Sequence, residues 1–140
     1  MDNKIKHLEM IQGVINRMAN NSFLLKGWSV VLISALFALA AKDAHIYFVY
    51  LAYFPAVAFW VLDAYYLWQE RLFRKLYDKV RGLNESDIDF SMSTSAVQSE
   101  VSRWYKVARS TTMIIFHGVI IATIFIVMIM MLLTSGPKGG

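Results

Sequence analysis

The stretch from residue 46 to residue 82, IYFVYLAYFPAVAFWVLDAYYLWQERLFRKLYDKVRG, decides the fold. Its first 23 residues, Ile46 to Trp68, carry a single charge, that of Asp63. A helix needs about 20 mostly apolar residues to cross a hydrocarbon core of about 30 Å. The residues after Trp68 keep a helical spacing of apolar side chains but add many arginines and lysines. The stretch therefore predicts a membrane-crossing helix that continues into water as a charged rod and ends at Gly82.

Two further stretches have the same character. Residues 23–41 carry one charge, Lys26, and residues 111–133 contain no Asp, Glu, Lys or Arg. The whole chain of 140 residues is 57% hydrophobic and 17% charged, whereas soluble domains are about 45–50% apolar and about 25% charged. A globule of this size could not bury three such helices. We therefore expect an all-α integral membrane protein, with residues 1–140 as one membrane domain and transmembrane helices at 23–41, 46–68 and 111–133.

The distribution of basic residues predicts the orientation. Four lie in the segment before or just inside the first span and eight lie between the second and third spans, whereas Lys42 and Lys138 are the only two in the opposite segments. Basic residues collect on the cytoplasmic side of membrane proteins. The N-terminus and residues 69–109 are therefore expected in the cytoplasm, and the C-terminus outside it. This bias also accounts for the net charge of +4, so we expect no direct binding of nucleic acid.

The segments around the spans are expected to be helical as well. Residues 3–20 carry an apolar stripe that includes Ile11 and Ile15, which predicts an amphipathic helix. That helix either packs on the protein's own helices or lies in the membrane interface. Residues 20–22, Asn-Asn-Ser, form a polar break suited to capping the first span.

A cytoplasmic helical hairpin is predicted for residues 69–109. Its first arm is the extension of the second span, and a polar loop follows at 83–95. Ser95 and Gln98 have the spacing of a capping box, which would start a long third helix at Ala96 that runs to about Leu133. The closing residues 136–140, GPKGG, cannot hold a helix.

Three ionisable residues of the spans are expected at one depth. Counted from the cytoplasmic ends of their spans, Lys26, Asp63 and His117 all lie within roughly 5–9 Å of the same interface. Ionisable groups inside a membrane are costly and often functional. One interpretation is a structural ion pair that fixes the helices. A second is a titratable gate in an oligomeric pore, with His117 as its pH-sensitive member. A third is proton-coupled transport.

A face of the third span continues from this layer. It carries Ile121, Ile124 and Met128, one or more turns beyond His117. If this face lines an axis, the three side chains are candidates for an apolar gate that closes by dewetting. Lipid contact or helix packing is the simpler explanation of the same stripe.

Enzyme chemistry finds little support in the sequence. The chain lacks cysteine, a glycine-rich phosphate loop, and the HExxH and GxSxG motifs. The three histidines, His7, His45 and His117, fall at different predicted levels. We therefore expect no catalytic residues, no metal site and no cofactor.

Two segments carry a resemblance to known families. HLEMIQGVINRMANNSFLLKGW (7–28) and LDAYYLWQERLFRKLYDKVRG (62–82) resemble a group of small bacterial membrane proteins without an assigned role. The order of amphipathic helix, spans and charged cytoplasmic helix is similar to that of predicted pore-forming effectors of SLATT type. This resemblance implies an effector that permeabilises or depolarises the membrane in antiviral defence. The third span, and the lack of a recognisable sensor domain, depart from the two-span plan of that family.

Together these observations predict an oligomeric membrane effector or channel of the bacterial inner membrane, acting in antiviral defence or a stress response. A cytoplasmic partner protein or signalling ligand would trigger it at the charged helices, through Arg71, Arg74, Lys75 and Arg103. The chain would assemble as a homo-oligomer, because three helices enclose no path alone. The rival hypotheses are a non-conducting interaction, accessory or immunity protein, and a small transporter or membrane enzyme.

Overall fold

The fold is a bundle of long helices, seen in a computed structural model that describes residues 1–136. The helices are α1 (Asp2–Asp43), α2 (Tyr47–Arg81), α3 (Trp104–Ala108) and α4 (Thr111–Thr134). Two 3-10 helices, η1 (Glu85–Asp87) and η2 (Ser95–Glu100), lie between α2 and α3. Residues 137–140 of the predicted tail, with Lys138, lie outside the described residues. The expectation of an all-helical fold is confirmed for residues 1–136.

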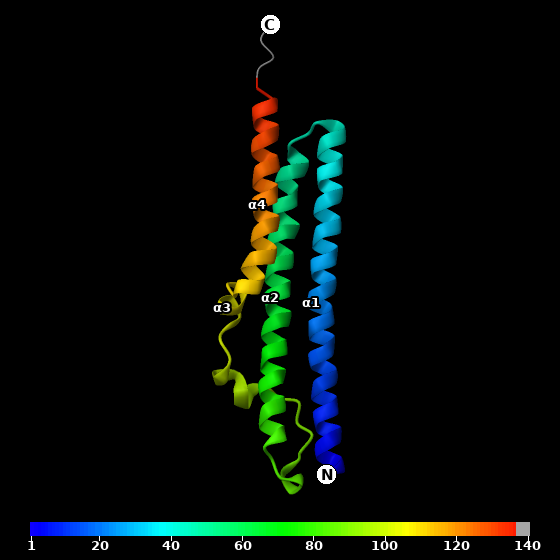
Figure 1. Cartoon of the computed structure of the whole chain (residues 1–140), viewed down its shortest axis with the longest axis vertical. Coiled ribbons are helices and arrows are strands. Elements are labelled where there is room, and N and C mark those ends of the chain that lie inside the picture. Colours follow the sequence, from blue (N-terminus) through cyan, green and yellow to red (C-terminus); the bar gives the residue numbers. More distant parts are fainter. Residues whose placement is uncertain (137–140) are drawn as a thin grey trace.

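Helices α1 and α2 form one antiparallel hairpin, and the two helices run side by side over nearly their whole length (Figure 1). The connection is tight because Ala44 adopts a left-handed conformation (φ 51°) and donates its backbone N–H to the Ala40 carbonyl. Helix α4 runs antiparallel to α2 along only the half nearest this turn. The molecule therefore has a three-helix half, which we call the span half, and a two-helix half, which we call the stalk.

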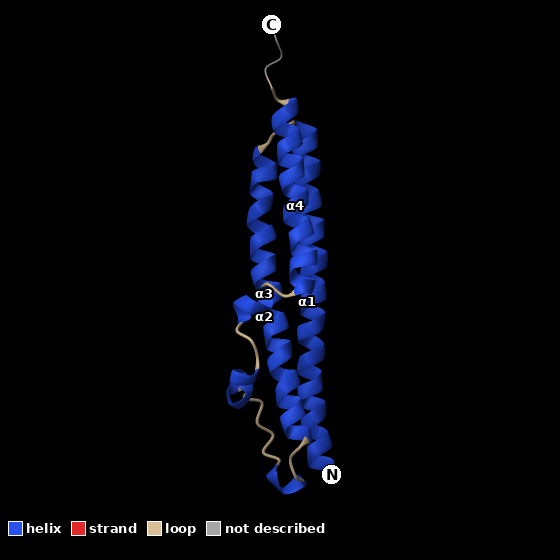
Figure 2. Cartoon of the chain, turned by 60° about the vertical axis from the view of Figure 1, so that its left-hand side comes forward, coloured by secondary structure: helices blue, strands red, loops and turns tan. Residues whose placement is uncertain are grey.

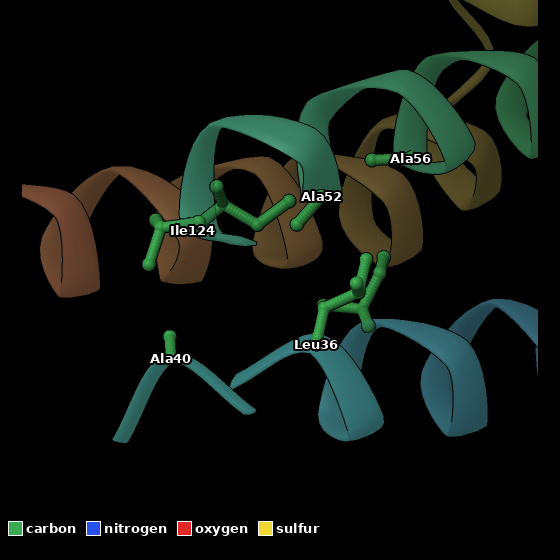
Figure 3. Close-up of a cluster of buried hydrophobic side chains, with 7 residues drawn as sticks. Leu36, Ala40, Ala52, Ala56 and Ile124 are labelled. Atoms are coloured by element: carbon green, nitrogen blue, oxygen red, sulfur yellow. The ribbon is translucent and has the colours of Figure 1, made fainter. Parts of the chain in front are cut away.

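Each half has its own apolar core. In the span half, α1, α2 and α4 contribute the buried residues Ile33, Leu36, Ala40, Val49, Ala52, Ala56 and Ile124. The alanines let the helix backbones come close together, as small residues do in membrane bundles (Figure 3). In the stalk, Ile11 and Ile15 of α1 pack with Leu76 and Val80 of α2 and with Val97 of η2. The apolar stripe of residues 3–20 is therefore a packing surface, as the first of its two interpretations predicted.

Three helices are long and apolar enough to cross a membrane, namely α1, α2 and α4. This agrees with the three predicted spans. The extension of the second span beyond Trp68 is also confirmed, since α2 continues to Arg81 and Gly82 is its C-cap residue.

The predicted break at residues 20–22 is wrong, because α1 continues through Asn20, Asn21 and Ser22 without interruption. These residue types cost a helix only about 0.5–0.7 kcal/mol each relative to alanine. Packing of α1 against α2 on both sides of this point outweighs that cost. Ser22 also has a use within the helix, because its hydroxyl bonds to Asp63 of α2 instead of capping.

The second arm of the predicted hairpin is also wrong, because no continuous helix runs from Ala96 into the third span. Residues 95–100 form η2, and the predicted capping box is absent: the N-cap of η2 is Thr94, with no side-chain cap hydrogen bond. Extended backbone at Arg103 (ψ 152°) and Ser110 (ψ 154°) separates α3 from its neighbours on either side. Valine and serine, which recur at residues 95–102, are weaker helix formers than the leucines, arginines and lysines of residues 69–81. The segment therefore follows α2 as short turns (Figures 1 and 2).

Candidate functional site

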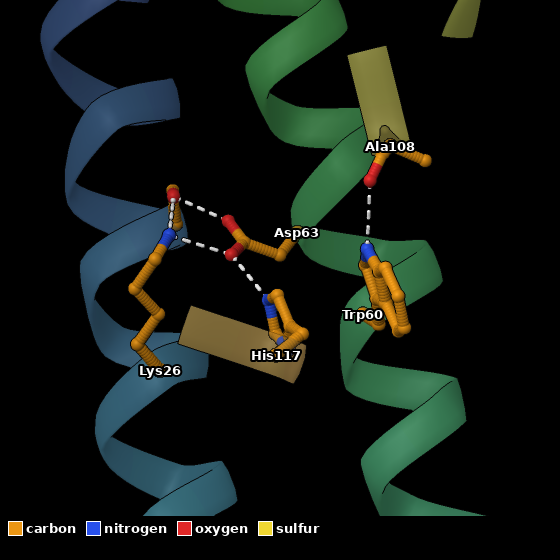
Figure 4. A network of polar contacts seen from close by, with 6 residues as sticks. Lys26, Trp60, Asp63, Ala108 and His117 are labelled. Atoms are coloured by element: carbon orange, nitrogen blue, oxygen red, sulfur yellow. Dashed lines mark hydrogen bonds and ion pairs between the residues drawn. The ribbon is translucent and has the colours of Figure 1, made fainter. Parts of the chain in front are cut away.

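A buried carboxylate lies at the junction of α1, α2 and α4. The Asp63 side chain of α2 is fully buried. Its Oδ2 accepts hydrogen bonds from Lys26 Nζ of α1 at 2.5 Å and from His117 Nε2 of α4 at 2.8 Å. Its Oδ1 accepts a hydrogen bond from the hydroxyl of Ser22, also on α1 (Figure 4). We call Ser22, Lys26, Asp63 and His117 the polar network.

The helices position these side chains through simple spacings. Ser22 and Lys26 are four residues apart and so lie on the same face of α1, where Lys26 Nζ also donates to the Ser22 hydroxyl at 2.9 Å. His117 lies nearly two turns into α4, on the face that contacts α2. The structure thus brings together Lys26, Asp63 and His117, the residues placed at one depth by counting along the spans.

The electrostatics of the network explain how the charged Asp63 carboxylate is stable in a buried position. A carboxylate has roughly four lone-pair sites and no donor when ionised, and Asp63 fills three of them with Ser22, Lys26 and His117. Lys26 supplies the opposite charge and keeps about a quarter of its side chain exposed. Burying a charge is tolerated where a partner and further hydrogen bonds offset the loss of hydration. The network therefore ties three helices together at one point.

Two aromatic rings adjoin the network. The Trp60 ring is stacked on His117, with ring centroids 5.7 Å apart and an interplanar angle of 6°. Its Nε1 donates to the Ala108 carbonyl at 2.9 Å, which attaches α3 to α2 (Figure 4). Lys26 Nζ lies 5.7 Å from the centre of the Phe116 ring, within the range of a cation–π interaction.

Sequence reasoning missed Ser22 and Trp60 as members of this site. Ser22 was predicted to take part in a helix cap, and no role was predicted for Trp60. Helical spacing contains a signal for both, because Ser22 precedes Lys26 by four residues and Trp60 precedes Asp63 by three. Each residue therefore shares a helix face with an ionisable residue of the network.

The three apolar gate candidates lie inside the single chain's core. Ile124 is fully buried among residues of α1 and α2 (Figure 3). Ile121 and Met128 are partly buried and pack against the same cluster. Within one chain this face of α4 is thus engaged in helix packing. A path along it would require α4 to move away from α1 and α2.

The four basic residues of the predicted signal-receiving surface line two neighbouring cavities. Arg71, Arg74 and Lys75 line a shallow cavity of about 320 Å³ beside Glu100 of η2. Arg103 lies instead beside a cavity of about 630 Å³ between α2, η2 and α3. Val101 lines both cavities, so the four candidates lie in neighbouring parts of the molecule.

The end of the stalk carries a second polar cluster, which joins α1 to the loop after α2. His7 is fully buried, with its Nε2 2.9 Å from the Ser91 carbonyl and its ring near Phe90. Glu85 accepts from the backbone N–H of Asn3 at 2.9 Å and lies 2.6 Å from the N-terminal ammonium. The hydrogen bond from that ammonium lowers the pKa of Glu85, and the bonds from α1 backbone N–H groups add to the effect. These contacts hold the loop against the start of α1.

No protein-family model, curated protein or solved structure matches this chain. Within residues 1–136 no group of three or more His, Asp or Glu side chains is placed to hold a metal ion. The function is therefore argued from the polar network and the helices that carry it.

Proposed function

We propose that the chain is a multi-pass protein of the bacterial inner membrane, with the stalk in the cytoplasm and the C-terminus on the opposite side. Three long apolar helices support this placement. The distribution of basic residues supports the orientation, because twelve of the fourteen lie in segments on the stalk side of the bundle or just inside it.

Its proposed activity is that of an oligomeric effector or channel that permeabilises or depolarises the membrane when triggered from the cytoplasm. The observation that carries this proposal is the polar network. An ion pair and a histidine hold together the three helices that would cross the membrane, at the level where α4 begins. Because α1 and α2 run unbroken from this level through the stalk, a force on the stalk reaches the network through rigid helices.

In this proposal the single chain is the closed state. Its span-half core is tightly packed, with Val49, Ala52 and Ile124 at 0% exposure. Conduction then needs several copies, either around a shared axis or with α4 displaced from its own α1 and α2. The exposed apolar faces of the three long helices offer surface for lipid or for such copies. A role in antiviral defence or stress rests on the resemblance to SLATT-type effectors.

Flux through proteoliposomes tests the activity. We compare potassium flux for the wild type, for Asp63→Asn and for Asp78→Asn, which removes an exposed carboxylate of the stalk. Because Asp63→Asn weakens the contacts that hold α4, we expect basal flux to rise about tenfold, the effect of roughly 1.4 kcal/mol on a closed–open equilibrium. Asp78→Asn should match the wild type. If none of the three proteins conducts potassium, with or without a partner protein or ligand added on the stalk side, a channel is excluded.

A non-conducting interaction or accessory protein is the second candidate. The same closed core and the well-partnered carboxylate favour it, since both describe a stable scaffold without an internal path. Size-exclusion chromatography with light scattering in mild detergent separates the two. A monomer that also fails to conduct supports the accessory role, whereas a discrete oligomer with flux supports the channel.

A further inference from the structure

The segment from residue 101 to 110, VSRWYKVARS, forms a basic and aromatic surface beside the span half. It contains three basic residues and no acidic one. Arg103, Lys106 and Arg109 are all exposed, and none of the three forms an ion pair with another of the described residues 1–136. Lys106 and Arg109 are three residues apart on α3 and its C-cap and so share one side of it, while Arg103 is the extended N-cap residue. The surface therefore offers uncompensated positive charge at a fixed place in the fold.

The inward side of the segment fixes that place. Val107 is fully buried, and the Ala108 carbonyl accepts the hydrogen bond from Trp60 Nε1. Trp60 in turn stacks on His117 of the polar network. The C-terminal end of α3 is thus attached at the network's level, where α4 begins (Figures 1 and 4). In the proposed placement this is the cytoplasmic boundary of the membrane.

Aromatic side chains accompany the basic ones. Trp104 and Tyr105 are 43% and 38% exposed. Together with Trp68 they line the cavity of about 630 Å³, whose polar lining includes Arg103, Gln98 and Ser99. Tryptophan and tyrosine are enriched at the level of lipid headgroups, because their rings are apolar and their N–H or O–H groups are polar.

We propose that this surface binds the headgroup of an anionic phospholipid of the cytoplasmic leaflet. The Arg103 guanidinium matches a phosphate with paired hydrogen bonds, and Gln98 and Ser99 can bond the hydroxyls of a glycerol headgroup. The aromatic rings of Trp68 and Trp104 contact the apolar side of the lipid. Lys106 and Arg109 strengthen the attraction to a negatively charged leaflet. This inference requires the membrane placement proposed above, but it does not require conduction.

Lipid retention measures the binding. The full chain is placed in nanodiscs of phosphatidylcholine with one quarter phosphatidylglycerol, extracted in mild detergent, and its bound lipids are counted by native mass spectrometry. The test variant is Arg103→Gln/Lys106→Gln/Arg109→Gln. The matched control is Arg71→Gln/Arg74→Gln/Lys75→Gln, which removes the same charge from α2 of the stalk. We expect the preference for phosphatidylglycerol to fall about tenfold or more in the test variant and less than about twofold in the control.

Other results would overturn the proposal. Unchanged preference in the test variant would exclude this surface, and an equal loss in both variants would show attraction by net charge only. Competition by soluble glycerol phosphate as strong as that by lipid would assign the cavity to a soluble anion. If the triple variant fails to fold, Arg103→Gln alone decides: it removes the guanidinium proposed to hold the phosphate and should lower the preference, and an unchanged preference there excludes the site.

The same samples separate this inference from the proposed function. Flotation with vesicles reports membrane placement, and potassium flux reports conduction. A variant that floats and conducts like the wild type but has lost its lipid preference supports the site alone. A wild type that retains phosphatidylglycerol yet never conducts removes the channel proposal and leaves the lipid site intact.

Discussion

Asp63 shows at the scale of one residue how a carboxylate can stay in apolar surroundings. Its side chain has no exposure to solvent, and its two oxygens accept from Ser22, Lys26 and His117. The cost of removing the charge from water is offset by an opposite charge and by geometry supplied from two other helices. The residue is therefore sensitive to changes that remove the charge but keep the volume.

Asp63→Asn makes that sensitivity measurable. The amide cannot accept from all three donors as an ionised carboxylate does, and it leaves Lys26 without its counter-charge. Removing one member of a buried ion pair costs about 3–5 kcal/mol in soluble proteins, and we expect a loss of about 3 kcal/mol for this variant. Unfolding of the purified protein in mixed micelles, followed by tryptophan fluorescence, gives the value.

Asp78→Asn is the matched control for this stability measurement, because its carboxylate is 56% exposed and its ion pair with Arg81 spans 3.5 Å. Surface substitutions of this kind usually stay within about 0.5 kcal/mol. Equal stabilities of the two variants would show that the network contributes nothing to the fold.

At the scale of elements, periodicity predicted the long helices well. Residues 69–81 keep an apolar stripe without a breaker, and α2 accordingly extends to Arg81. Length and hydropathy likewise identified the third span, now α4, and residues 23–41 of α1, but not the continuity of α1 through residues 20–22. Residues 95–110 were predicted poorly. Their valines and aromatics fit a helix stripe, but the segment instead packs Val97 and Val107 inward from short turns. A stripe alone does not distinguish one continuous helix from several turns against the same partner.

The sequence predicted the depth of the candidate site's residues along the spans but not the rotation of each helix about its own axis. Counting residues along each span placed Lys26, Asp63 and His117 at one level. Counting could not show which helix faces meet, because the rotation of each helix depends on packing between all three. For the same reason the sequence could not show that Trp60 bridges His117 and Ala108.

Trp60→Phe tests this bridge between elements. Phenylalanine keeps a ring that can stack on His117 but lacks the N–H that bonds the Ala108 carbonyl. We expect a loss of about 1 kcal/mol, confined to α3 and its flanks, and hence faster hydrogen–deuterium exchange at residues 104–110. Trp28→Phe is the control, because Trp28 lies on α1 and is 64% exposed. Exchange that accelerates equally in α1 and α3 would contradict a local bridge.

At the scale of the whole molecule, the α1–α2 hairpin joins two environments. The span half exposes large apolar side chains such as Phe54, Val119 and Ile126, each more than half exposed. The stalk exposes mostly charged and polar ones and keeps its own core. Because the two cores on these continuous helices are separate, the stalk can be pulled or twisted without first disrupting the packing around Ile124.

The proposed orientation of this hairpin is open to a direct test, because the chain contains no cysteine. Single cysteines are introduced at Ser86 in the loop of the stalk, at Asp43 beside the tight turn, and at Ile126 in the middle of α4. A membrane-impermeant maleimide should label Ser86→Cys only in inside-out vesicles and Asp43→Cys only from the outer side. Ile126→Cys should stay unlabelled from both sides, since lipid covers a side chain that is 57% exposed in the isolated chain. The reverse pattern at the first two positions would refute the orientation derived from the basic residues. Labelling of Ile126→Cys in intact vesicles would show that α4 does not cross the bilayer. Lipid would then not surround the polar network, and its proposed role in a membrane would fail.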